Sequence, residues 1–266
     1  PDGGIHRFHV PGDKAGTLNG WYVLYLDGIA SGAFGSWKAG SAHTWCSREP
    51  LNAHEAEQVR QRVEQARRQR EAEQHQRQQA VAEYANRLWR DARRADPGHR
   101  YLAAKGVRAY GLRQHRDRLL VPLVRDGVVV NLQSIAPDGS KLFQSGGQVR
   151  GCYSPLGVIT PGAPLYVCEG WATAATIHAE TGAAVAAAMN AGNLLAVGQR
   201  LQRQHSDAVP IVAGDDDRQT EGNPGKTAAT KAAATLGCGL VLPPWSGAEP
   251  LTLSDFNDLA NWRATQ

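Results

Sequence analysis

The sequence predicts an α/β fold for residues 158–266, with a parallel sheet flanked by helices. Two observations carry this prediction. Short apolar runs at 165–168 and 208–213 each end in acidic residues, and stretches rich in alanine follow them. Strand-like and helix-like segments also alternate through this region, which is typical of parallel sheets with right-handed crossovers.

Residues 1–50 alternate apolar and polar residues around glycine-rich turns, which predicts a small β module with a hairpin at Asp27-Gly28. Its aromatic residues allow two interpretations, a stacking surface for single strands or the core of the module. We expect the core, because aromatic residues usually fill small β modules. The aromatic residues concerned are Trp21, Tyr22, Tyr25, Phe34, Trp37 and Trp45.

Residues 51–96 are rich in Glu, Gln, Arg and Ala, and no Gly or Pro occurs between positions 51 and 95. This composition predicts a long helical connector. A basic helix can follow a phosphate backbone, but the acidic residues nearly match the basic ones, which favours a solvated helix with Glu–Arg pairs. We therefore expect the connector to pack loosely, and a fragment from about Asp96 to Gln266 to fold alone.

Residues 97–157 predict a small, basic, mixed α+β module. Asp96-Pro97-Gly98 ends the preceding helix. Three strand-like runs follow between 116 and 143, separated by the turn sequences Asp126-Gly127 and Asp138-Gly139.

The acidic residues of residues 158–266 predict a metal site. Asp215 and Asp217 share a face of an extended chain, so both can point at one cation. Mg²⁺ accepts one or two carboxylates and keeps several waters, and Mn²⁺ is an alternative ion. If the strand that ends at Glu169 is a neighbour, three carboxylates meet and repel unless a metal lies between them. The plainer alternatives are a structural calcium site and surface carboxylates.

These motifs together resemble the TOPRIM domain of bacterial-type primases, topoisomerases and some nucleases. The resemblance rests on Glu169-Gly170, the turn 188–194, Asp215-Asp216-Asp217 and the late Asp255-Phe-Asn-Asp258. The Asp255-Phe-Asn-Asp258 motif is similar to the sequence found in phage and plasmid primases. The resemblance implies a DNA primase that makes short RNA primers on single-stranded DNA by Mg²⁺-dependent nucleotidyl transfer, in phage, plasmid or mobile-element replication.

The resemblance also implies roles for individual residues. Trp171 and Thr173 depart from the Tyr-x-Asp that commonly follows Glu-Gly in cellular primases. Glu169 is either a third metal ligand or a general base, and this choice stays open. The implied catalytic residues are Glu169, Asp215 and Asp217; the implied metal ligands are these three with Asp255 and Asp258; the implied nucleotide or template contacts are Arg118, Lys141, Asn193 and Lys226.

The stretch Asn223-Pro-Gly-Lys226 precedes a helix-forming segment. Backbone N–H groups at a helix start, with a lysine beside them, can hold phosphate. The stretch lacks the Gly-x₄-Gly-Lys-Ser/Thr pattern of a P-loop, so we do not expect an ATPase.

Composition limits the remaining alternatives. The net charge of +4 fits a nucleic-acid partner. No apolar run approaches the ~20 residues of a membrane span, and the four scattered cysteines predict free thiols in the cytoplasm. The chain begins at Pro1 without Met, so we expect a fragment that a zinc-binding module precedes in the full protein.

The expected partners are template DNA, ribonucleoside triphosphates and a replicative helicase. Two other functions remain open, a TOPRIM metal-dependent nuclease and a non-catalytic single-stranded DNA-binding module. Ribonucleotide incorporation on a single-stranded template separates the primase from both.

Overall fold

The computed structural model describes residues 3–266, which form two compact units. The first unit ends at Arg77 and the second comprises Gln78–Gln266. The long helix α1 (Ala53–Asp91) supplies its first part to one unit and its second part to the other.

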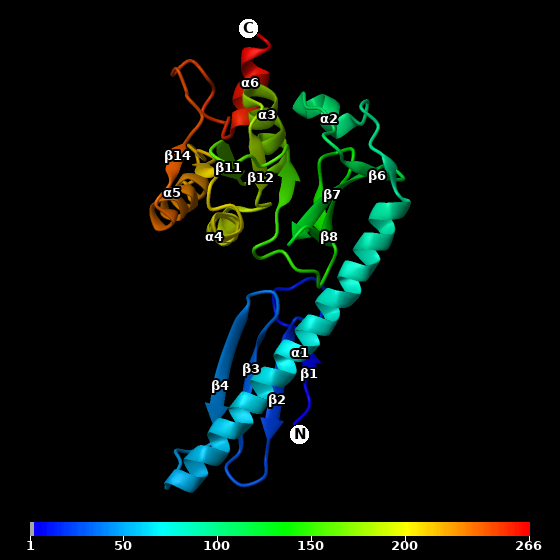
Figure 1. Ribbon diagram of the computed structural model, residues 1–266. Helices are drawn as coiled ribbons and strands as arrows, with labels where there is room; N and C mark the ends of the chain where they lie inside the picture. The colour runs from blue at the N-terminus through cyan, green and yellow to red at the C-terminus, as the bar shows by residue number, and fades with distance from the viewer. Residues whose placement is uncertain (1–2) are drawn as a thin grey trace. The chain divides into compact units, whose positions relative to one another are not determined.

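The first unit contains a four-stranded antiparallel sheet in which each strand pairs with the next along the chain (Figure 1). The predicted hairpin at Asp27-Gly28 is confirmed, since it joins the second and third strands, and Gly28 has the left-handed φ of +68° that such a turn needs. Helix α1 covers one face of the sheet and buries Ala66 completely. The strands are β1 (His6–Phe8), β2 (Gly20–Tyr25), β3 (Ser31–Ser36) and β4 (Ser41–Cys46).

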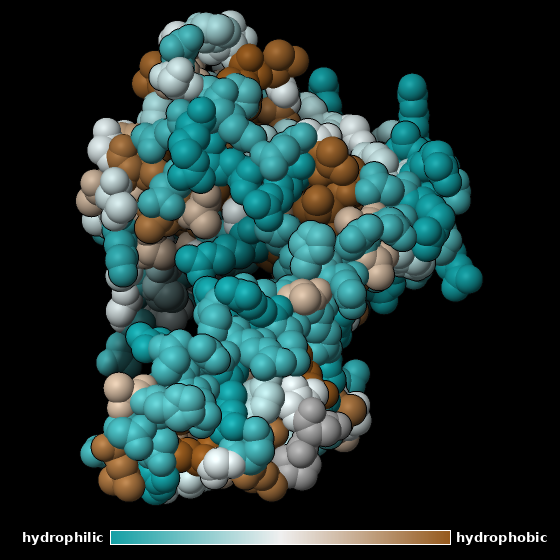
Figure 2. Space-filling view, turned by 60° about the horizontal axis from the view of Figure 1, so that its bottom comes forward, coloured by the Kyte–Doolittle hydropathy of each residue, from teal (hydrophilic) through white to brown (hydrophobic). Residues whose placement is uncertain are grey.

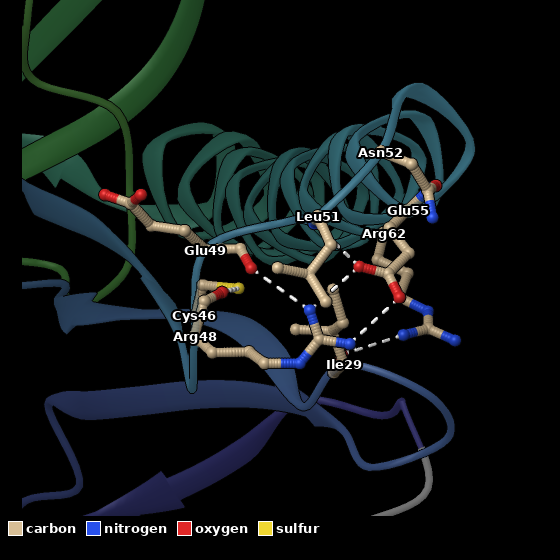
Figure 3. Close-up of polar contacts among 8 residues, drawn as sticks. All are labelled: Ile29, Cys46, Arg48, Glu49, Leu51, Asn52, Glu55 and Arg62. Atoms are coloured by element: carbon tan, nitrogen blue, oxygen red, sulfur yellow. Dashed lines mark hydrogen bonds and ion pairs between the residues drawn. The ribbon is translucent and has the colours of Figure 1, made fainter.

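Helix α1 starts at a reciprocal cap (Figure 3). The Asn52 side chain accepts a hydrogen bond from the Glu55 N–H at 2.9 Å, and the Glu55 carboxylate accepts one from the Leu51 N–H at 2.9 Å. Arg48, just after β4, donates two hydrogen bonds to the same carboxylate, at 2.8 and 2.9 Å. These bonds lower the pKa of Glu55 to about 2, with Arg48 as the largest cause. The cap therefore ties the helix start to the end of the sheet.

The surface of α1 contains several Glu–Arg ion pairs, as its nearly equal numbers of acidic and basic residues predict. Glu64 pairs with Arg67 at 2.8 Å and with Arg68 at 3.0 Å. The expectation of loose packing is wrong, however. Ala66 lies in the core of the first unit, and Ala85 is equally buried in the second. Alanine lets a helix approach a sheet closely. A narrow row of small apolar residues on α1 is therefore still a packing face, although its periodicity in the sequence is weak.

The second unit begins with an antiparallel sheet. Its central hairpin turns at Asp126-Gly127, where both residues have left-handed φ, +51° and +78°, so this predicted turn is confirmed. The predicted turn at Asp138-Gly139 is confirmed too. The elements, with the short helix between them, are β5 (Arg93–Arg94), α2 (Arg100–Lys105), β6 (Arg113–His115), β7 (Arg118–Arg125), β8 (Val128–Ile135) and β9 (Lys141–Phe143).

A second sheet has the strand order β10-β12-β11-β13-β14. Four of its strands are parallel, as predicted, but the edge strand β10 is antiparallel to β12, so the sheet is mixed. The strands are β10 (Ser154–Leu156), β11 (Pro164–Cys168), β12 (Ala184–Ala187), β13 (Val209–Ala213) and β14 (Gly239–Val241). The helices are α3 (Trp171–Thr181), α4 (Leu194–Gln204), α5 (Pro224–Leu236) and α6 (Phe256–Arg263), with a 3₁₀ turn η1 (Ala191–Asn193).

Two hydrophobic cores lie on the two faces of this mixed sheet. Alternate residues of β11 divide between them: Cys168 packs with α3 and the antiparallel sheet, while Val167 packs with α4 and α5. Trp171 is 2% exposed in the first core, and Val197 is fully buried in the second. Both faces are covered, so functional groups of the sheet are left at its strand ends.

In the described part of the chain, no helix is long and apolar enough to cross a membrane. The face drawn in Figure 2 is mostly hydrophilic, with small separate hydrophobic patches.

Candidate active site

The carboxyl ends of β11 and β13 lie side by side. The two strands are parallel and hydrogen-bonded, with Cys168 paired to Ala213. Glu169 follows β11 directly, and Asp215 follows β13 after Gly214. The expected convergence of the two acidic motifs at one sheet edge is therefore present, because parallel strands place their chain continuations at the same edge.

The charges at this edge repel one another. Burial, followed by repulsion from Asp255 and Glu169 and from two further carboxylates, raises the pKa of Asp215 to about 8. Burial and neighbouring carboxylates also raise the pKa of Glu169 and that of Asp255. Such shifts require the carboxylates to be close together in a poorly solvated place. The further carboxylates that act on Asp215 are Asp217 and Asp258.

One oxygen of this group has no partner. Oδ1 of Asp215 is buried and accepts no hydrogen bond from any described residue. No three His, Cys, Asp or Glu side chains within residues 3–266 are arranged as a complete metal cage. A bare carboxylate oxygen among like charges fits an ion held by one or two carboxylates and several waters, which is how Mg²⁺ binds.

Asp217 is held by the start of α5. Its Oδ2 accepts a hydrogen bond from the Gly225 N–H at 2.9 Å, and its own N–H donates to Asn223 Oδ1 at 2.9 Å. Asn223 also caps the helix by accepting from the Lys226 N–H at 3.3 Å. The expected phosphate cradle at 223–226 is wrong in its backbone part, because these N–H groups already have protein acceptors. The ammonium of the exposed Lys226 side chain lies 3.9 Å from Oδ1 of Asp216.

Asp216, between the two candidate ligands, has a structural role. Its Oδ1 accepts from Asn223 Nδ2 at 2.7 Å and its Oδ2 accepts from the Trp245 indole at 3.0 Å. Its N–H donates to the Ser254 carbonyl at 2.7 Å. Asp216 thus joins the strand end to the segment that leads into α6.

Glu169 is held by the turn after β12. Its carbonyl accepts a hydrogen bond from the Met189 N–H at 2.7 Å, and its carboxylate accepts one from the Ala191 N–H. Met189 has a φ of +72°, a left-handed conformation that is uncommon for a residue with a long side chain. A strained turn is therefore kept where it orients the glutamate.

Asp255 and Asp258 form the cap of α6. Oδ1 of Asp255 accepts from the Asp258 N–H at 2.8 Å, and Oδ2 of Asp258 accepts from the Ser254 N–H at 3.2 Å. Asp255 also bonds to the Thr173 side chain, and Asp258 pairs with Lys105 at 3.3 Å. The two residues reach the acidic group from a separate part of the chain while also starting the helix.

A cleft of about 580 Å³ lies beside the acidic group, bounded by α2, the β8–β9 turn and α6. Lys141 lies there with its ammonium 5.6 Å from the centre of the Tyr101 ring. Loss of hydration around the ammonium, then repulsion by Lys105, lowers the pKa of Lys141, while Asp255 opposes this shift. The cleft is thus lined by Lys105, Lys141 and, from the acidic group, Asp258.

Arg118, the other predicted basic residue, opens β7. Its Nη1 is buried and has no hydrogen-bond partner among the described residues. Arg118 also contributes to the lowered pKa of Asp138 in the β8–β9 turn, where the main cause is the Ser140 N–H. The guanidinium therefore lies near the β8–β9 turn, with hydrogen-bonding capacity left for a ligand.

Asn193, which the sequence assigned to nucleotide or template contact, has a structural environment instead. The residue is 3% exposed, and its side chain is used by the backbone. Oδ1 accepts from the Gly151 N–H at 2.7 Å. Nδ2 lies within hydrogen-bonding distance of the carbonyls of Val149, Cys152 and Ala188, at 3.1, 2.9 and 2.8 Å. Asn193 therefore joins the segment before β10 to the end of β12.

Sequence reasoning missed Lys105 and Thr173 as members of this site. Lys105 lies 153 positions before its partner Asp258, so no local pattern connects them. Thr173 was noted only as a departure from the cellular pattern. Its position four residues after Glu169 was the available signal, because that distance spans one turn at the start of α3.

Comparison with known proteins adds an independent finding. Residues 164–265 match the Toprim domain family. The chain is 34% identical over 260 residues to a DNA primase TraC of Escherichia coli, across 93% of this chain and 18% of that protein. It is 32% identical over 271 residues to a second DNA primase TraC of Escherichia coli, across 93% of this chain and 24% of that protein.

The chain therefore spans less than a quarter of the length of these curated relatives. Among solved structures, it is similar to that of the DnaG primase catalytic domain bound to ssDNA, with 16% identity and a TM-score of 0.46 over 72% of this chain and 78% of that one. A likeness at this level does not establish a shared function.

Proposed function

We propose that this chain, whose residues 164–265 form a Toprim domain, is the catalytic part of a DNA primase that joins ribonucleotides on a single-stranded DNA template. The relatives named DNA primase TraC support this proposal, since they align with nearly the whole chain. A cytoplasmic location and a role in plasmid, phage or mobile-element replication go with it.

One observation carries the proposal. Asp215 is buried among four other carboxylates, with its Oδ1 unpartnered, beside a cleft that contains Lys105 and Lys141. Acidic residues that hold a cation, next to basic residues that attract phosphates, are what nucleotidyl transfer requires, because the reaction depends on charge neutralisation and positioning. A surface cluster of carboxylates would be solvated and would not share these pKa shifts.

The residues divide the work as follows. Asp215 and Asp217 would hold a divalent ion, Mg²⁺ or Mn²⁺, with Asp255 and Asp258 near a second ion. Such ions supply charge stabilisation to the attacking and leaving oxygens. Gly225 fixes one oxygen of Asp217 through its N–H, which leaves the other oxygen for the ion.

The basic residues bind and orient the nucleic acid. Lys141 and Lys105 would neutralise phosphates in the cleft, and Arg118 would donate hydrogen bonds from the start of β7. Glu169 is a ligand or a general base, because its raised pKa suits either role once a cation is near. A replicative helicase and a zinc-binding module remain proposed partners.

The test is RNA synthesis on a single-stranded template with ribonucleoside triphosphates and Mg²⁺. Asp215→Asn with Asp217→Asn should lower the rate by at least about a hundredfold, since two charges that meet the ion are removed. Its unfolding midpoint in EDTA should not fall, because the change relieves repulsion. Undiminished synthesis by this double variant would refute the assignment.

Asp207→Asn is the matched control, as Asp207 is an exposed aspartate on the same unit, before β13. It should leave synthesis unchanged. Cleavage of the template, without any ribonucleotide incorporation by the unmodified protein, would instead indicate the nuclease.

A further inference from the structure

A row of rings crosses the four-stranded sheet of the first unit. The strand registers pair His6 with Tyr22, Tyr22 with Phe34, and Phe34 with His43. All four side chains therefore lie on one face, in line across the strands. The row covers three strand spacings, roughly 14 Å at ~4.8 Å each.

The two outer pairs of rings in the row are in contact. The His6 and Tyr22 rings are stacked, with centroids 5.1 Å apart, and the Phe34 and His43 rings are 5.5 Å apart. Phe8 lies beside the row, 6.3 Å from Tyr22. Contacts of this kind restrict the rings to few orientations, so the surface is formed before any ligand arrives.

Glycine on β2 makes room for this arrangement. The Phe8 ring lies over Gly20, where an added Cβ would stand 2.5 Å from the ring. Trp45 lies two residues beyond His43 on β4 and has the same facing. Phe8 and Trp45 therefore lie on opposite sides of the row.

These rings remain open to solvent. Tyr22 is 38% exposed, Phe34 44% and Trp45 47%. The opposite face contains Trp21, which is 1% exposed and packs with Ala66 of α1. The aromatic residues thus divide between the two faces, and the expectation that all of them form a core is wrong for the exposed half.

The strand residues of this face carry no negative charge that would repel an anionic partner. The four strands contain no Asp or Glu. The one formally charged strand residue, Arg7, pairs with Trp21 in the register and lies on the α1 side, where it forms an ion pair with Glu73. Imidazoles of His6 and His43 stand at the two ends of the row. A face of rings without carboxylates accepts the flat bases of a polyanion without like-charge repulsion.

We propose that this face of the first unit binds single-stranded DNA by stacking two or three unpaired bases on Tyr22, Phe34 and Trp45. Four-stranded sheets with exposed aromatic residues stack that number of bases in other proteins. A duplex hides its base faces and would not fit. The stacking argument is independent of the proposed function, and only the choice of DNA over RNA rests on it.

The test measures binding of a labelled oligo(dT) to the full chain in EDTA, so that metal-dependent chemistry plays no part. Tyr22→Ala with Phe34→Ala should weaken affinity by about tenfold or more, since two stacks are lost. The slope of log affinity against log salt should stay unchanged, because no phosphate contact is removed. Tyr22→Phe with Phe34→Tyr should keep the affinity, since both rings remain.

Tyr84→Ala is the matched control, because Tyr84 is 47% exposed on α1 and belongs to neither face of the sheet. It should bind as the unmodified chain does. An equal loss in this control, or unchanged binding by the alanine double variant, would overturn the proposal. The proposal would also be overturned if the unmodified chain formed a dimer and only the alanine double variant were monomeric. Tighter binding of oligo(rU) than of oligo(dT) would overturn it as well.

A second measurement does not depend on removing side chains. Binding of oligo(dT) should quench tryptophan fluorescence, and Trp45→Phe should remove most of that quenching while keeping the affinity. Quenching that persists undiminished in Trp45→Phe would overturn the proposal. Both measurements are made without metal, so they test DNA binding separately from primer synthesis. Synthesis can be absent while binding is present, and binding can be absent while synthesis is present.

Discussion

The Asp217 carboxylate accepts a hydrogen bond from the Gly225 N–H at 2.9 Å, and a Cβ added at Gly225 would stand 2.8 Å from that same oxygen. The helix start therefore both orients the carboxylate and depends on the missing side chain. The positive end of the helix dipole also favours the ionised carboxylate.

Gly225→Ala should displace both Asp217 and Asp215. The Cβ of Asp215 would be 3.1 Å from the new methyl group. We expect the affinity for Mn²⁺, measured by electron paramagnetic resonance, to fall by about tenfold or more, because the candidate ligands no longer face one point. Synthesis should fall with it.

Thr230→Ala supplies the control for Gly225→Ala, since Thr230 is exposed on the same helix. It should leave Mn²⁺ binding unchanged. Alanine usually stabilises a helix relative to glycine, by about 1 kcal/mol. A Gly225→Ala variant that gains stability and binds Mn²⁺ normally would show that the close contact has no functional effect.

Stability without metal should fall as pH rises. The folded-state pKa of Asp215 is about 8, above its ordinary value of 3.8, so the folded protein holds this proton more tightly than the unfolded chain. As pH rises from 3.8 to about 8, the Asp215 carboxyl therefore lowers the free energy of unfolding. The pKa values of Glu169 and Asp255 are raised too, so these groups act in the same direction. Thermal unfolding in EDTA should show a lower midpoint at about pH 8.5 than at about pH 6.

Asp215→Asn should reduce this dependence on pH, and Mg²⁺ should restore the midpoint mainly at the higher pH. If the unfolding midpoint in EDTA rose from about pH 6 to about pH 8.5, in the unmodified chain or in Asp215→Asn, the proposed repulsion would be contradicted.

Asn193→Ala should destabilise the second unit without acting on substrates directly. It removes up to four hydrogen bonds of a buried side chain and leaves backbone groups without partners. We expect a loss of about 2–4 kcal/mol in urea unfolding.

The exposed neighbour Gln199 on α4 gives a control, as Gln199→Ala should change stability by less than about 0.5 kcal/mol. Template affinity of the folded Asn193→Ala variant should match that of the unmodified chain. A stable variant with weakened template affinity would instead favour direct contact.

A fragment that begins at Gln78 should fold, whereas one that begins at Asp96 should not be stable. Leu120 and Leu132 are 2% and 0% exposed and pack against Ala85 and its helical neighbours, which the shorter fragment lacks. Exposing both leucines costs about 3–6 kcal/mol. Circular dichroism during thermal unfolding distinguishes the fragments, and equal midpoints would contradict this division of the chain.

The sequence predicted the sheet edge correctly because the information is local. A run of apolar residues that ends in Glu169, and another that ends in Asp215, places carboxylates at strand ends whatever the rest of the chain does. The pairing of Cys168 with Ala213 then follows from parallel topology.

Other features depend on contacts between distant segments. The ion pair of Lys105 with Asp258 has no sequence pattern, and neither have the hydrogen bonds of Asn193 to the segment before β10. The two facings of Tyr22 and Trp21 were present in the alternation of β2, but only the position of α1 decides which side is buried.

The Asp215-Asp216-Asp217 run also has a consequence for how natural variation would look. The outer two side chains face the proposed chemistry, whereas the middle one bonds to Asn223 and Trp245. In a mutational scan, loss of Asp216 should reduce the amount of protein in the cell, while loss of either neighbour should leave abundance intact and remove replication. Three identical letters in a row would then be retained under two different kinds of selection.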